Sequence, residues 1–132
     1  MRVTADTNVL VRALVDDEPE QARLAREALA ASELVAITLP ALCEVVWVLR
    51  RGYRIPPAGI VAFLRRLIGA RNVAVDHGAV ALGIAMLESG GDFADGAVAW
   101  AGTQLGGETF LSFDRTAVAL LAAQGHGGRV PQ

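Results

Sequence analysis

Lysine is absent from this 132-residue chain, so all twelve basic residues are arginines. Its absence excludes Schiff-base lysine chemistry, the lysine-containing phosphate-binding loop and the receiver-domain pattern, which also includes a lysine. The single cysteine, Cys43, cannot form an internal disulfide, which fits a cytoplasmic location. No uninterrupted apolar run approaches the ~18 residues of a membrane span, although 53% of the residues are hydrophobic. The composition predicts a single domain, residues 1–132, with a large core and no membrane segment.

The first candidate site residue is Asp6, between an apolar stretch and a helical pattern. Residues 3–5 favour a strand, and apolar residues recur at helical spacing from Val9 to Leu14. In open α/β sheets, ligands are held where strands end and helices begin, so a carboxylate here would face a site. The alternative is that Asp6 only caps the helix, because Asp is a favoured N-cap residue.

Glu44 is the only charged residue between Leu34 and Leu49. We expect a strand over 34–39 and a helix from Pro40 to about Gly52 that is apolar nearly all round. Such a helix is covered on both faces, so Glu44 is predicted to be at least partly buried. A buried carboxylate needs a partner, a proton or a metal, and an arginine partner is the alternative to a metal.

Two further carboxylates, Asp92 and Asp95, follow the break at residues 90–91 and share one face of a predicted helix. The small residues Gly96, Ala99 and Gly102 continue that face and could leave room for an ion and a phosphate group. The alternatives are a capping-box role for Asp92 and close packing of the small residues against a neighbouring helix.

Asp114 repeats the position of Asp6, because it lies between a predicted strand over 108–113 and a predicted helix over 116–123. Taken by itself, Asp114 is also explained by a capping role, because Asp is a favoured N-cap residue. The remaining expected elements are helices over 17–32, 60–68 and 77–89, with Asp17 as the cap of the first, a short strand over 72–75, and one edge strand in the glycine-rich tail. Strands alternating with helices predict a three-layer α/β sandwich with a mostly parallel central sheet flanked by helices.

The chain resembles the PIN-domain ribonucleases, and among them the VapC-type toxins of prokaryotic toxin–antitoxin pairs. The matching pieces are DTNVLVR from Asp6, EVVWVL from Glu44, DFADGAVA from Asp92 and FLSFDR through Asp114. The resemblance maps the family's acidic positions onto Asp6, Glu44, Asp95 and Asp114, with Asp92 as an additional acid. The polar residues that support the acids in the family correspond to Thr7, Asn8 and Ser112 of this chain. Ser112 stands where Thr is common in the family, and Gly96 where Ala is common.

The resemblance implies an endoribonuclease that cleaves RNA phosphodiester bonds with water activated by Mg²⁺ or Mn²⁺, together with a homodimer and a cognate antitoxin. Hard oxygen ligands suit these ions, and without metal such close carboxylates would repel one another. Setting four acids aside leaves twelve arginines against ten acids, so the remaining surface is mildly basic. With one Tyr and two Trp, base stacking is not expected, and Arg115 and Arg12 are the first candidates for phosphate contacts.

Two other interpretations stay open at this point. A haloacid-type phosphatase would need a second Asp two positions after Asp6, where this chain has Asn8. A non-catalytic PIN-like nucleic-acid-binding or scaffold domain is possible, because a fold does not fix an activity. Cleavage that disappears with a chelator distinguishes a metal-dependent nuclease from both.

Overall fold

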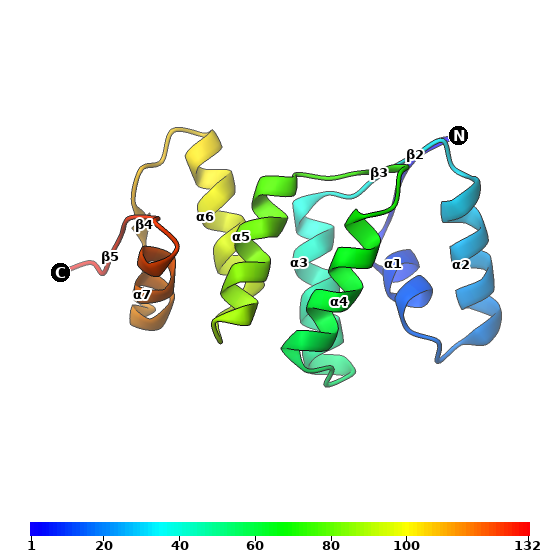
Figure 1. Ribbon diagram of the computed structural model, residues 1–132, viewed down its shortest axis with the longest axis horizontal. Helices are drawn as coiled ribbons and strands as arrows, with labels where there is room; N and C mark the ends of the chain where they lie inside the picture. The colour runs from blue at the N-terminus through cyan, green and yellow to red at the C-terminus, as the bar shows by residue number, and fades with distance from the viewer. The chain divides into compact units, whose positions relative to one another are not determined.

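The computed structural model describes all 132 residues, which group into two compact units, Met1–Asp76 and His77–Gln132. Each unit has its own parallel strands connected by helices (Figure 1). The predicted α/β fold with parallel strands is confirmed. A three-stranded sheet lies in the first unit and a two-stranded sheet in the second.

The Met1–Asp76 unit is built on a parallel sheet with the strand order β1-β2-β3. Its elements are, in chain order, β1 (Arg2–Thr4), α1 (Thr7–Leu14), α2 (Pro19–Ala31), β2 (Leu34–Ala36), α3 (Leu39–Trp47), the π-helical segment η1 (Val48–Gly52), α4 (Pro57–Ile68) and β3 (Val73–Ala74). Val3 pairs with Val35, and Val35 with Val73, so the carboxyl ends of the strands lie at one edge. The helices α1 and α3 begin at this edge, which is where parallel α/β sheets hold their ligands.

Apolar faces of the helices form the core of this unit. The side chains that are fully or almost fully buried come from α1, β2, α3, η1 and α4: Leu10, Val35, Leu42, Val45, Leu49, Ile60 and Leu64. The strand β2 is shorter than predicted, because Thr38 already serves as the N-cap of α3 and its hydroxyl accepts from the Ala41 N–H at 3.4 Å. The periodicity of the apolar residues therefore located the helices well and the strand ends less well.

The start of α2 differs from the prediction. The N-cap residue is Glu18, without a capping hydrogen bond from its side chain, so the prediction that Asp17 caps this helix was wrong. The carboxylate of Asp17 instead accepts a hydrogen bond of 2.7 Å from the hydroxyl of Tyr53, 36 residues further along the chain. Local spacing cannot reveal such a distant partner.

The His77–Gln132 unit consists of α5 (His77–Glu88), α6 (Phe93–Gln104), β4 (Phe110–Leu111), α7 (Arg115–Ala123) and β5 (Gly128–Arg129). The strand β5 is the edge strand expected in the tail, and it pairs in parallel with β4. The core of this second unit includes a cluster of buried side chains: Leu82, Met86, Ala99 and Leu121. The carboxyl end of β4 leads directly into α7, as that of β1 leads into α1.

Close contact between α5 and α6 explains the glycine at position 96. A Cβ atom there would lie 2.7 Å from the carbonyl oxygen of Leu82, so only glycine permits this approach of the two backbones. The alternative of close helix packing therefore holds for Gly96. Gly102, by contrast, has open space where its Cβ would be.

Candidate active site

Asp6 lies at the junction of β1 and α1, and it does not act as a side-chain cap. It occupies the N-cap position with extended backbone dihedrals, but its carboxylate accepts no hydrogen bond from the first turn of α1. The residue is exposed and forms no ion pair. Capping, the simplest alternative to a functional role, is thus not what this carboxylate does.

Thr7 links α1 to Glu44 on α3. The hydroxyl of Thr7, whose residue is 8% exposed, donates a hydrogen bond of 2.6 Å to Glu44 Oε2. The partner of Glu44 is therefore a hydroxyl and not an arginine, and Thr7 supports the carboxylate as the resemblance implied. Asn8, the next residue of α1, is exposed.

The predicted burial of Glu44 was wrong, because this residue is exposed. Trp47, which belongs to the same side of α3, is also 63% exposed. The prediction assumed that a helix rich in apolar residues is covered on every side. In the first unit only the side of α3 that carries Leu42, Val45 and Val46 is buried.

The second unit brings three carboxylates near one another. Asp92 is the N-cap residue of α6 without a side-chain capping hydrogen bond, and Asp95 lies in the first turn of that helix. Burial raises the pKa of the Asp95 carboxyl above its usual value, and the charges of Asp92 and Asp114 raise this pKa further. No ion pair neutralises any of these three carboxylates.

Asp114 combines its position with a capping role. One of its carboxylate oxygens, Oδ1, accepts from the Ala117 N–H at 2.9 Å, which caps α7. The N–H of Asp114 donates to the Ser112 hydroxyl at 3.0 Å, so Ser112 supports the turn that presents Asp114. The cap uses Oδ1, and Oδ2 remains available to a ligand.

The predicted site residues thus occur in two sets: Asp6 and Glu44 in the first unit, and Asp92, Asp95 and Asp114 in the second. Neither unit by itself contains three His, Cys, Asp or Glu side chains arranged around a metal position. The chemistry of the donors nevertheless fits a hard divalent cation, because the sets provide carboxylate oxygens without arginine partners.

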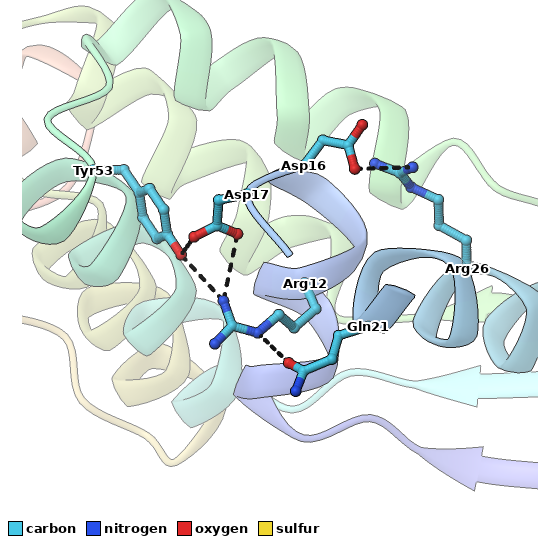
Figure 2. Close-up of polar contacts among 6 residues, drawn as sticks. All are labelled: Arg12, Asp16, Asp17, Gln21, Arg26 and Tyr53. Atoms are coloured by element: carbon cyan, nitrogen blue, oxygen red, sulfur yellow. Dashed lines mark hydrogen bonds and ion pairs between the residues drawn. The ribbon is translucent and has the colours of Figure 1, made fainter. Parts of the chain in front are cut away.

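Sequence reasoning missed a polar network at the end of α1 (Figure 2). Arg12 donates from Nε to Gln21 at 2.7 Å and from one terminal nitrogen to Asp17 and to the Tyr53 hydroxyl, at 3.4 Å each. The hydrogen bond from Tyr53 to Asp17 closes the network. Arg12 is therefore already engaged, whereas Arg115 is exposed and forms no ion pair in its unit. Of the two arginines expected to contact phosphate, only Arg115 keeps its guanidinium free.

In the comparison with protein families, the model of the PIN domain matches residues 3–120. The chain belongs to the PIN-domain family. The PIN domain is a nuclease-type fold, and its members typically use divalent metals and bind nucleic acid. The comparison with curated proteins found no match. None of the helices in this PIN domain is both long and apolar enough to cross a membrane.

Proposed function

We propose that this PIN domain is a Mg²⁺- or Mn²⁺-dependent endoribonuclease whose ion is held by Asp6, Glu44, Asp95 and Asp114, with Asp92 as an auxiliary acid. The observation that carries the proposal is the arrangement of carboxylates in the second unit: Asp95 is partly buried in the first turn of α6 near Asp92 and Asp114, and none of the three has an ion-pair partner. Like charges gathered without compensation are costly in a protein and occur where a bound cation offsets them.

The residues of the chain have distinct tasks in this proposal. Thr7 orients Glu44 through its hydroxyl, and Ser112 orients Asp114 through the backbone of the turn. A bound divalent ion would supply activation of water and stabilisation of charge on the phosphodiester. Within the second unit, neither histidine forms an ion pair with Asp92, Asp95 or Asp114, and a histidine general base is not part of the proposal.

Contacts to RNA are proposed to depend on backbone phosphates and not on stacked bases. Arg115 follows Asp114 directly and its exposed guanidinium is free to bind a phosphate beside the proposed ion. The chain has only one Tyr and two Trp, which offers few platforms for unstacked bases.

The decisive experiment is cleavage of a structured RNA and an unstructured oligonucleotide in Mn²⁺, in Mn²⁺ with excess chelator, and over a salt series. We expect cleavage only with free metal. In Arg115→Ala, RNA binding should weaken on both substrates and the slope of log affinity against log salt should fall by about one. Arg51→Ala, at an exposed arginine of η1, is the control. RNA binding without cleavage would favour the non-catalytic nucleic-acid-binding domain instead.

We further propose, from the resemblance to VapC-type toxins, a toxin role with a homodimer and an antitoxin that blocks the site. An apolar cleft of about 420 Å³ in the first unit supports a protein partner. It lies between α2, α4 and the sheet, and its lining includes Leu29, Val35, Leu67 and Val73. Co-purification with the product of the adjacent gene, lost in Leu67→Glu and retained in Leu24→Glu, would support this role. A wild-type protein that stays monomeric and does not bind the product of the adjacent gene would overturn the toxin role.

A further inference from the structure

The segment after α3 adopts an unusual backbone conformation that directs Tyr53 toward α1. In η1 the helix widens to a π-helical turn, and the Tyr53 N–H donates to the Val48 carbonyl, five residues earlier, at 3.1 Å. A turn with one additional residue changes the direction of every side chain that follows it, and such turns are frequent at functional sites. The chain then leaves η1 through Arg54, whose φ of 55° lies in the left-handed region.

A left-handed conformation costs an L residue with a side chain about 1–2 kcal/mol. It persists where surrounding contacts fix the segment. The contacts next to Arg54 are those of the Tyr53 hydroxyl, which donates to Asp17 at 2.7 Å and accepts from Arg12 at 3.4 Å. The geometry of this segment thus brings the tyrosine to the end of α1.

Helix α1 is consequently attached to the α3–η1 segment at two places. At its first turn, Thr7 donates to Glu44. At its last turn, Arg12 contacts Tyr53, and Asp17 and Gln21 bind the same guanidinium from the chain that follows α1 (Figure 2). A second arginine reinforces this end, since Arg26 Nε donates to the Ala13 carbonyl at 2.9 Å.

A helix of eight residues held at both ends cannot rotate about its axis or slide without breaking one of the attachments. A single exposed ion pair contributes little to the stability of a protein. Here one guanidinium has three partners, so the entropy lost in fixing Arg12 is shared among several hydrogen bonds.

We propose that Tyr53 is a positioning residue: through Arg12 and Asp17 it fixes α1 against α3, and thereby keeps Asp6 and the Thr7–Glu44 contact in the arrangement that the proposed ion requires. The inference rests on the proposed function for its effect on metal binding. Its structural part, the effect of Tyr53 on Thr7, is independent of that function.

The test compares Tyr53→Phe and Asp17→Ala with Glu27→Gln, which removes an exposed partner of Arg23 elsewhere on α2. In metal-free protein, we expect the amide and methyl NMR signals of Thr7 to shift in both network variants and to stay unchanged in the control. In titrations with Mn²⁺, the network variants should bind about three- to tenfold more weakly, an effect smaller than that of directly supporting groups. Cleavage should recover at saturating Mn²⁺, which a general loss of folded protein would not produce.

The outcomes separate the inference from the proposed function. Unchanged Thr7 signals in Tyr53→Phe would overturn the positioning role whatever the metal titration gives. A wild type that binds no Mn²⁺ would overturn the proposed function, and the Thr7 signals would then decide the positioning role alone. Tyr53 is the only tyrosine, so its phenolate absorbance reports the network directly. The hydrogen bond to Asp17 raises the pKa of Tyr53, and Asp17→Ala should lower this pKa toward its ordinary value.

Discussion

The two strand-to-helix junctions of this PIN domain look alike in sequence and differ in structure. At each, a carboxylate follows a strand and precedes a helix: Asp6 between β1 and α1, and Asp114 between β4 and α7. Asp114 caps its helix by accepting from Ala117, whereas Asp6 makes no capping hydrogen bond. The N-cap position therefore does not by itself decide whether a carboxylate stabilises the helix that follows it. Because only Asp114 caps a helix, its substitution should affect both stability and metal binding, whereas substitution of Asp6 should affect metal binding alone.

The largest expected effect is on metal binding, where the two junctions should behave alike. We expect Asp6→Asn and Asp114→Asn each to weaken Mn²⁺ binding by about 100-fold or more, because a lost ligand costs at least as much as a lost supporting group. Asn is as good an N-cap residue as Asp, so the cap of α7 is retained. Asp95→Asn should weaken Mn²⁺ binding by a similar factor, and Asp92→Asn should weaken it less. Isothermal titration calorimetry decides this, and equal losses at Asp92 would mean that it is a ligand and not an auxiliary acid.

The next effect is on stability, where the two junctions should differ. Asp114→Ala removes a cap and should lower the free energy of unfolding by about 1 kcal/mol. Asp6→Ala removes no capping hydrogen bond and should change it by about 0.5 kcal/mol or less. Urea unfolding of the metal-free proteins measures both, with Asp114→Asn as the control that keeps the cap. Equal destabilisation by the two alanine variants would contradict the difference between the junctions.

The smallest effect concerns Asp95, whose carboxyl has a raised pKa in the folded protein. The folded state then binds this proton more tightly than the unfolded state, so stability falls as pH rises through the raised pKa. Asp95→Asn should therefore raise Tm by about 1 °C at neutral pH in metal-free protein, and the gain should disappear toward pH 4, because solvent screening keeps the penalty small. Asp92→Asn should give part of this gain. A gain that is the same at both pH values would show that charge is not its cause.

Much of the fold followed from local patterns, as particular elements show. The predicted helix over 77–89 is observed as His77–Glu88, and the strand and helix around Asp6 are observed as β1 and α1. These elements carry apolar residues at a regular period, so their own sequence specifies them. The strand ends were less well predicted, because β2 and β4 end where turn and capping contacts begin.

The site was predictable in its residue types and less so in its contacts. The spacing of acids identified Asp6, Glu44, Asp92, Asp95 and Asp114 as candidates, and their roles as ligands stay a prediction. Burial of Glu44 and capping by Asp17 were wrong for one reason: both depend on neighbours from distant segments. The partner of Asp17 is Tyr53, and the partner of Glu44 is Thr7.

Local sequence patterns predicted the alternation of strands and helices and the set of candidate acids, because periodicity and residue type are local properties. The tertiary structure alone decided which carboxylate caps a helix, which arginine stays free, and how α1 is attached to α3. Each of these depends on hydrogen bonds between residues that are far apart in the chain, such as Thr7 with Glu44 and Arg12 with Tyr53. Their geometry is set by packing of the core, and a linear pattern does not encode it position by position.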